Sequence, residues 1–232
     1  MAVLALWLCE LRQQSKLCAS GFGRKEGLMT AADVMAAHRA TEDERSQVVT
    51  ALCRAFFDDR IYRWSVPDDD QRRRSAALFY SRFVDACWPH GEVYAAGGGA
   101  GAALWVPPGE QLVADDEAEA FARDLVESAG DEACSARMEQ LLQMLDDHHP
   151  ADACWYLPFM GVEPSAQGQG IGTRLLAAVL AQADRDQVPA YLEASCPENR
   201  RLYERHGFHT VRELTVADSP TLYAMWRPPR HR

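Results

Sequence analysis

The chain has 232 residues, of which 47% are hydrophobic and 25% are charged, as expected for one well-packed globular domain. Its 34 acidic and 24 basic residues give a formal net charge of -10. Nucleic-acid binding depends on clustered Lys and Arg. The acidic balance, and a basic run limited to residues 72–74, therefore disfavour a nucleic-acid partner.

The cysteines and the N-terminal residues bear on the compartment. Seven cysteines are scattered without a Cys-x-x-Cys pair. This pattern argues against a disulfide framework and a thiolate metal site, and it favours a reducing cytoplasm. Residues 1–9 are apolar but too few to span a bilayer, and no basic segment precedes them, so we expect neither a membrane partner nor a secretory signal. We predict that residues 1–28 are an N-terminal extension, or lie upstream of a start at Met29, and that residues 29–232 form a single domain.

Helices are expected at residues 41–56, 71–86 and about 138–145. Thr41 and Glu44 form a capping box at the start of the first. In the second, Leu78, Phe79 and Phe83 are expected to share one apolar face. Each of these apolar stripes is interpreted as core packing.

Strands and helices alternate in the second half of the chain. Residues 93–96 and 102–106 are predicted to form a hairpin around three glycines. Strands are then expected at 153–163, 190–195, 209–214 and 222–226, and helices at 170–184 and 197–206. Strands alternating with helices, followed by an antiparallel pair, predict a mixed α/β sheet.

The segment from Gln167 to Gly172 is rich in glycine, follows an apolar strand and opens a helix. Glycines there leave backbone N–H groups unobstructed at the positive end of the helix dipole, which favours a pyrophosphate. Neither a dinucleotide-binding Gly-x-Gly-x-x-Gly nor a Walker Gly-Lys-Ser/Thr is present. From turn chemistry alone, a tight strand-to-helix turn is the alternative.

Two motifs together resemble a known superfamily. Gln167–Gly172 resembles the Arg/Gln-x-x-Gly-x-Gly/Ala pyrophosphate loop of the GNAT acetyltransferases, and Asn199–Phe208 resembles their Asn…Leu-Tyr…Gly-Phe motif. Within the superfamily, residues 155–208 are most similar to the puromycin N-acetyltransferase group, through Trp155-Tyr156-Leu157, Tyr191–Ser195 and Pro197–Asn199. The resemblance covers roughly a quarter of the chain. It implies an α/β (α+β) GNAT-like fold: a mixed, mostly antiparallel twisted sheet of about seven strands, helices on both faces, and a splayed central notch for acetyl-CoA within residues 153–208.

The same resemblance implies which groups would hold the cofactor. The backbone of Met160, Gly161 and Val162 would bind the pantetheine arm, and Gly161 would permit a close approach. The pyrophosphate would be held by backbone N–H groups of Gln167, Gly168, Gln169, Gly170, Ile171, Gly172 and Thr173.

Acetyl transfer from a thioester to an amine also needs a proton donor for sulfur and a proton acceptor for the amine. Tyr203 is the candidate general acid, and Tyr203 and Asn199 are further candidate cofactor contacts. The alternatives are that Tyr203 only packs beneath Phe208 and that Asn199 caps a helix. Glu193 is the candidate general base, and a salt bridge or sheet-edge hydrogen bond is an equal alternative for it.

Three nearby features were weighed against this scheme. His148 and His149 could relay a proton, although a solvated loop is the commoner role, and no further zinc ligands are suitably spaced, so no metal is predicted. Cys196 raises acyl-cysteine chemistry, but no activating His is placed beside it, so direct transfer in a ternary complex is preferred. Pro158 interrupts a strand, which is tolerable if the strand splays there.

We therefore predict an acetyl-CoA-dependent N-acetyltransferase that acts on the primary amine of a small molecule. One alternative is an acyl-CoA-binding sensor or regulatory module without turnover. Another is a peptide or protein N-acetyltransferase, which would differ only in an acceptor cleft expected near residues 57–64 and 115–147. The sequence does not determine the oligomeric state, and a homodimer is the commonest soluble assembly.

Overall fold

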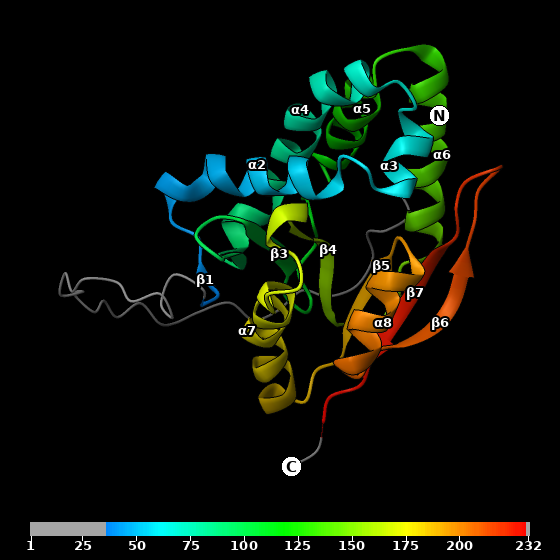
Figure 1. Cartoon of the computed structure of the whole chain (residues 1–232). Helices are drawn as coiled ribbons and strands as arrows, with labels where there is room; N and C mark the ends of the chain where they lie inside the picture. Colours follow the sequence, from blue (N-terminus) through cyan, green and yellow to red (C-terminus); the bar gives the residue numbers. More distant parts are fainter. Residues whose placement is uncertain (1–35, 231–232) are drawn as a thin grey trace.

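Seven strands form one mixed sheet in the computed structural model, which describes residues 36–230 (Figure 1). The strands are β1 (His38–Arg39), β2 (Val93–Ala96), β3 (Gly101–Val106), β4 (Trp155–Val162), β5 (Ala190–Ala194), β6 (His209–Leu214) and β7 (Leu222–Arg227). Their order is β1-β2-β3-β4-β5-β7-β6, and only the β4–β5 pair is parallel. The predicted sheet is therefore confirmed. The predictions about residues 1–28 and Met29 lie outside the described residues.

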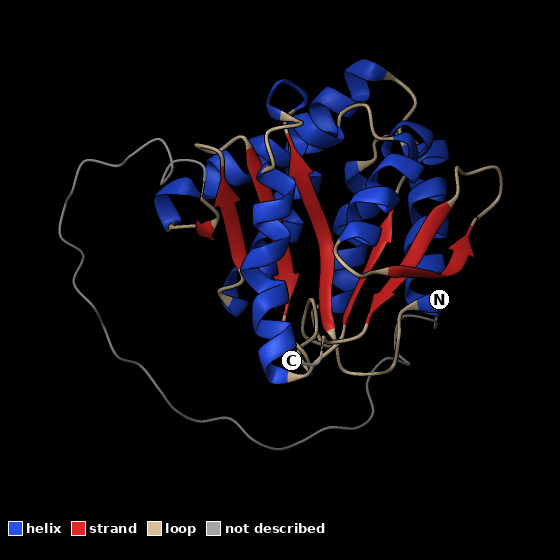
Figure 2. Ribbon diagram, turned by 60° about the horizontal axis from the view of Figure 1, so that its bottom comes forward, coloured by secondary structure: helices blue, strands red, loops and turns tan. Residues whose placement is uncertain are grey.

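Helices cover both faces of the sheet (Figure 2). They are η1 (Glu42–Glu44), α2 (Arg45–Phe56), α3 (Arg60–Ser65), α4 (Asp69–Cys87), η2 (Trp88–His90), α5 (Ala118–Ser128), α6 (Glu132–His148), η3 (Pro164–Ala166), α7 (Ile171–Asp186) and α8 (Pro197–Arg205). Helices α2 to α6 bury side chains in one core, and α7 and α8 bury theirs in a second core across the sheet. We call these two sides the α6 face and the α7 face. None of the described helices is both long and apolar enough to cross a membrane.

The expected helices before residue 150 are present, with one correction. Thr41 and Glu44 form the predicted capping box ahead of α2. On α4, Phe79 and Phe83 are buried, but Leu78 is 50% exposed, so its predicted place on the same face is wrong. The reason is geometric, because consecutive helical residues lie about 100° apart around the axis. Helix α3 and strand β1 were not expected, since each is too short for a periodic pattern.

Strand β4 separates from β5 halfway along its length. It pairs with β5 only from Trp155 to Leu157, and then continues beside β3 alone. A register shift between Leu104 and Val106 of β3 faces Pro158. Such a bulge tolerates a residue without an N–H group and bends the strand. The splay expected at Pro158 is therefore present, and it opens a gap between β4 and β5.

Candidate functional site

The edge of β4 that faces the gap carries unpaired backbone groups. Glu163 donates its N–H to Ala100 of the β2–β3 turn at 2.8 Å, and hydrogen-bond direction alternates along a strand. The backbone groups of Met160 and Val162 therefore point toward the gap, whereas those of Gly161 point toward β3. The Val162 carbonyl accepts a hydrogen bond from Gln167 Nε2 at 3.2 Å. The N–H groups of Met160 and Val162 remain available on this edge.

The packing of α2 against β4 explains why position 161 is a glycine. A Cβ at this position would lie 2.6 Å from Cβ of Ala55 and 3.0 Å from Phe56 Cε2, both on α2. Glycine thus allows α2 to pack directly on β4 beside the gap. The close approach that we expected at Gly161 is made by α2.

The glycine-rich loop lies at the N-terminus of α7, as predicted. Gly168 and Gly170 both have φ of 77°, a conformation that disfavours residues with a Cβ. No side chain caps the helix. The N–H groups from Gly168 to Thr173 have no hydrogen-bond partner among the described residues. This row of free donors at the positive end of the α7 dipole is suited to an anion.

Arg174 adds a charge to this loop that the sequence reasoning missed. Its Nη1 donates to the Gln169 carbonyl at 2.9 Å, and the side chain is otherwise exposed. Arg174 follows the motif by two residues, so the signal was present in the sequence as a basic residue in the first turn of the helix. The guanidinium places a positive charge beside the free N–H groups.

Tyr203 lies on α8 and is 6% exposed. Its ring packs edge-on against Phe208 with centroids 5.9 Å apart, so the packing alternative is observed. Its hydroxyl, however, makes no hydrogen bond to any described residue. Burial raises the pKa of the phenol above its ordinary value, with Cys196 and Asp59 adding to the rise, so Tyr203 holds its proton at neutral pH.

A polar network connects α3, the end of β5 and α8. Asp59 caps α3 by accepting hydrogen bonds from the N–H groups of Ile61 and Tyr62. Its other carboxylate oxygen accepts the Ser195 hydroxyl, which in turn accepts Asn199 Nδ2 at 3.5 Å. The network joins helices from the two faces of the sheet beyond the end of β5.

The cap of α8 differs from the alternative weighed for Asn199. Helix α8 begins at Pro197, and the Cys196 sulfur accepts the Asn199 N–H at 3.5 Å, so Cys196 is the capping residue. Burial raises the pKa of the Cys196 thiol. A thiol that stays protonated is a poor nucleophile, which is consistent with direct transfer.

Glu193 lies on β5 and points to the α6 face. One of its carboxylate oxygens, Oε1, is buried without a hydrogen-bond partner among the described residues. Burial raises the pKa of Glu193 to about 7, and the phenols of Tyr191 and Tyr156 oppose the rise. A carboxyl group with a pKa near neutrality can both accept and release a proton at working pH. No salt bridge to Glu193 is found among the described residues.

The two histidines lie at the C-terminal end of α6. The His149 ring packs edge-on against Tyr156 and Tyr191, with centroids 4.5 and 5.3 Å apart, and burial lowers its pKa to about 4. His148 Nδ1 donates to the Met144 carbonyl at 2.8 Å. Within residues 36–230, no group of three or more His, Cys, Asp or Glu side chains is arranged to hold a metal ion.

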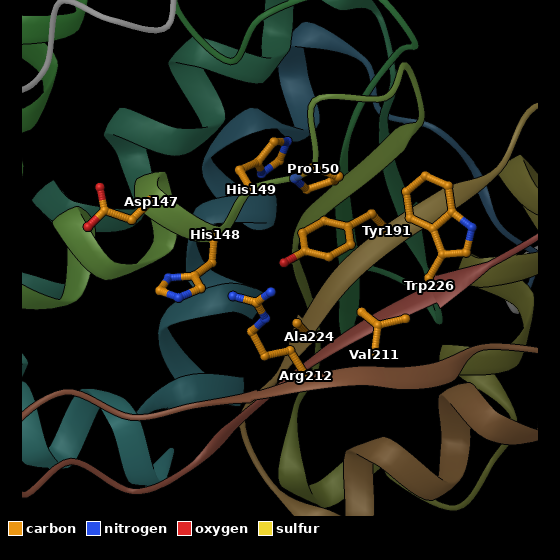
Figure 3. Close-up of a pocket in the computed structure, with 9 residues that line it drawn as sticks. All are labelled: Asp147, His148, His149, Pro150, Tyr191, Val211, Arg212, Ala224 and Trp226. Carbon is orange, nitrogen blue, oxygen red and sulfur yellow. The ribbon is translucent and has the colours of Figure 1, made fainter.

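A hollow of about 320 Å³ lies beside these histidines on the α6 face (Figure 3). We call it the α6 hollow. Its lining residues are Asp147, His148, His149, Pro150, Tyr191, Val211, Arg212, Ala224 and Trp226. Tyr191 is two residues from Glu193 on the same face of β5, so the hollow adjoins the candidate base.

Comparisons with known proteins find sequence similarity to acetyltransferases. Residues 139–210 match the family model described as an acetyltransferase (GNAT) domain. A Schizosaccharomyces pombe protein described as an uncharacterized N-acetyltransferase is 28% identical over 186 residues, which are 75% of this chain and 74% of that protein.

Two solved structures extend the comparison to the fold. A Corynebacterium glutamicum protein, described as histone acetyltransferase HPA2 and related acetyltransferase, aligns with a TM-score of 0.59 at 24% identity, over 85% of this chain and 97% of its own. Drosophila melanogaster polyamine N-acetyltransferase, which catalyses the formation of N-acetylagmatine, aligns with a TM-score of 0.57 at 12% identity, over 83% and 98%. None of these descriptions mentions puromycin, so the resemblance to that group stays a prediction.

Proposed function

We propose that this chain transfers acetyl from acetyl-CoA to the primary amine of a small molecule. Its fold, which is that of the GNAT acetyltransferases, and the match of residues 139–210 to a GNAT family model support this proposal. The observation that carries the proposal is the gap between β4 and β5. It is bordered by free N–H groups of β4 and α7, by a buried carboxyl group on β5 and by a protonated phenol on α8.

The residues around the gap fit acetyl-CoA. The backbone N–H groups of Met160 and Val162 would hold the pantetheine arm, and those from Gly168 to Thr173 would hold the pyrophosphate, with Arg174 adding charge. Gln167, whose side chain bonds the Val162 carbonyl, connects these two sets of donors. When bound, acetyl-CoA supplies the acetyl group as an activated thioester.

Two side chains then move protons. Glu193 accepts a proton from the attacking amine, as the new C–N bond forms and the C–S bond breaks. Tyr203 Oη donates a proton to the departing sulfur. Proton gain at Glu193 and proton loss at Tyr203 balance, so solvent restores both groups after each turnover. Direct transfer in a ternary complex needs no cysteine nucleophile, in keeping with the raised pKa of Cys196.

The acceptor is taken to be a small-molecule amine because the α6 hollow beside Glu193 is compact. The polyamine N-acetyltransferase with a similar fold also acts on a small amine. An acyl-CoA sensor would need neither the proton donor nor the proton acceptor. The cytoplasmic location remains a prediction, and a homodimer remains an open assembly that the sequence does not determine.

A calorimetric titration with acetyl-CoA tests the cofactor part, with NADH and ATP as controls. We expect micromolar binding of acetyl-CoA alone. Equal binding of the controls, or no binding of acetyl-CoA, would contradict the assignment of the gap. Thiol release across a library of primary amines then tests turnover, and binding without release from any amine would favour the sensor.

A further inference from the structure

The α6 hollow contains a buried polar atom that no described residue satisfies. Tyr191 is 2% exposed, and its hydroxyl is buried without a hydrogen-bond partner. Leaving a buried hydroxyl unpaired costs free energy, so a polar group that reached it from the hollow would bind favourably. The Glu193 carboxyl group, two residues along the same face of β5, raises the pKa of this phenol, so such a group would lie close to the candidate base.

A cation is placed beside that hydroxyl. Arg212 lies on β6 in register with Ala224 of β7, which is itself in register with Glu193 of β5. The short Ala224 side chain between them leaves room above the sheet. Figure 3 shows the Arg212 guanidinium on the same side as the Tyr191 hydroxyl, and its charge acts to lower the pKa of that phenol, against the larger effect of burial.

A bulge in β6 accounts for the position of Arg212. The register shifts between Thr210 and Arg212, so Val211 is an additional residue in this strand. An additional residue changes which face each later side chain meets. The shift places Arg212 on the α6 face, while Val211 is 54% exposed at the rim of the hollow.

No acidic group of the described residues is paired with Arg212. No ion pair or hydrogen bond joins it to any residue from 36 to 230. The nearby Asp147 carboxylate accepts a hydrogen bond from Gln143 at 2.8 Å and points away from the hollow in Figure 3. The His148 imidazole bonds the Met144 carbonyl through Nδ1, which therefore carries a proton and offers no negative charge.

Flat rings form part of the remaining wall, beside the polar side chains of Asp147 and His148. His149, Tyr191 and Trp226 contribute rings, with the Tyr191 and Trp226 centroids 6.5 Å apart, and Pro150 closes one side. Burial keeps His149 uncharged at neutral pH. Rings of this kind pack well against a planar apolar body.

We propose that the α6 hollow selects the acceptor, and that the acceptor is an amine with a flat apolar body and a carboxylate at its far end, held by Arg212 and the Tyr191 hydroxyl. This rests on the proposed function, since it takes Glu193 to be the site of the amine. The backbones of Glu193 and Arg212 are separated by two strand spacings, or about 10 Å, so the acceptor must reach across β7 from one side chain to the other.

Two probes of the same shape test the proposal. 4-(2-Aminoethyl)benzoic acid carries the carboxylate, and 4-(2-aminoethyl)benzamide is its uncharged counterpart. Their dissociation constants are measured by calorimetry, with and without CoA, for the wild-type protein, Arg212→Gln and Arg185→Gln. Arg185 is an exposed arginine in the last turn of α7 and serves as the matched control.

We expect the wild-type protein to bind the acid at least about tenfold more tightly than the amide, as for a charge-assisted hydrogen bond. Arg212→Gln should remove this difference without changing affinity for the amide, and Arg185→Gln should retain it. Equal affinities in the wild type, an unchanged difference in Arg212→Gln, or no binding of either probe would overturn the proposal. Probe binding does not require acetyl transfer. A failure of thiol release with Arg212-dependent binding intact would therefore refute the proposed function and leave the hollow's selectivity standing.

Discussion

Replacing Glu193 by glutamine should stabilise the protein while it abolishes most of its activity. Glu193 has a buried carboxylate oxygen without a hydrogen-bond partner, and burial raises its pKa from 4.5 to about 7. A charge held in such a place costs folding free energy. The neutral amide of glutamine has nearly the same shape and avoids that cost.

The size and sign of the effect follow from the two pKa values. The folded state binds the Glu193 proton more tightly than the unfolded state, so stability is lost as pH rises from 4.5 to about 7. Each unit of pKa difference corresponds to about 1.4 kcal/mol, which gives a full cost of about 3 kcal/mol above neutrality. At pH 8, the unfolding free energy of Glu193→Gln should therefore exceed that of the wild type by about 3 kcal/mol. At pH 4, this advantage of the variant should be smaller by the same amount.

Chemical denaturation at pH 4 and pH 8 measures this difference, with Glu213→Gln on the exposed part of β6 as the control. Any packing effect of the substitution is present at both pH values and cancels in the comparison. In parallel, kcat should fall by about 10²–10⁴, and the rise in wild-type activity through pH 7 should disappear. A stability difference that does not change between pH 4 and pH 8 would refute the burial argument, and an unchanged kcat would refute the role as base.

Three further substitutions test other parts of the site. Tyr203→Phe removes a hydroxyl that makes no hydrogen bond within residues 36–230, so stability and acetyl-CoA affinity should be unchanged while kcat falls by about 10²-fold or more; an unchanged kcat would make Tyr203 a packing residue. Thr173→Glu places a carboxylate in the exposed first turn of α7, where it favours the helix but should weaken acetyl-CoA binding by about tenfold or more in calorimetry. Thr173→Gln is its neutral control, and equal affinity of the two variants would argue against a pyrophosphate there. Gly161→Ala should cost about 1–3 kcal/mol in chemical denaturation, since its Cβ would lie 2.6 Å from that of Ala55, and a smaller loss would mean that α2 can move.

The parts of the site that could be predicted are local in sequence. The glycines from Gln167 to Gly172 were enough to predict the loop, because left-handed backbone and free N–H groups at a helix start both favour glycine. The strand that ends at Val162 and the helix that holds Tyr203 were expected within a residue or two of their observed bounds. Each signal lies within one turn, one strand or one helix.

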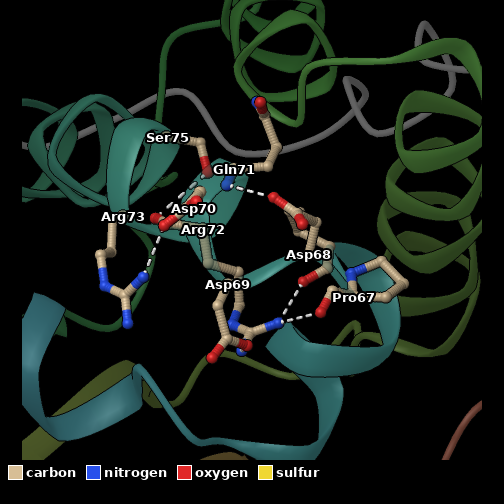
Figure 4. A network of polar contacts seen from close by, with 9 residues as sticks. Pro67, Asp68, Asp69, Asp70, Gln71, Arg72, Arg73 and Ser75 are labelled. Atoms are coloured by element: carbon tan, nitrogen blue, oxygen red, sulfur yellow. Dashed lines mark hydrogen bonds and ion pairs between the residues drawn. The ribbon is translucent and has the colours of Figure 1, made fainter.

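The parts that could not be predicted depend on contacts that no local periodicity reveals. Arg72, in a basic run that we interpreted only for its charge, is 1% exposed and donates hydrogen bonds to the carbonyls of Val66 and Pro67 (Figure 4). Ser195 bonds Asp59, a residue 136 positions earlier. The tertiary packing that creates these contacts leaves no periodic pattern in the sequence. The α6 hollow, built from the end of α6 and from β5 to β7, was missed for the same reason.

The separation of β4 and β5 explains how groups from opposite faces can act together. Along β5, Leu192 and Ala194 face α7, whereas Tyr191, and by strand alternation Glu193, lie on the α6 face. A continuous sheet would therefore keep the candidate base apart from Tyr203, which belongs to the core on the α7 face. The gap after Leu157 removes that barrier, and the hydrogen bonds from Asn199 to Ser195 and from Ser195 to Asp59 join the two faces beyond the end of β5. Under the proposed function, the Pro158 bulge, which interrupts the sheet, would allow an amine from one face to reach a thioester held from the other.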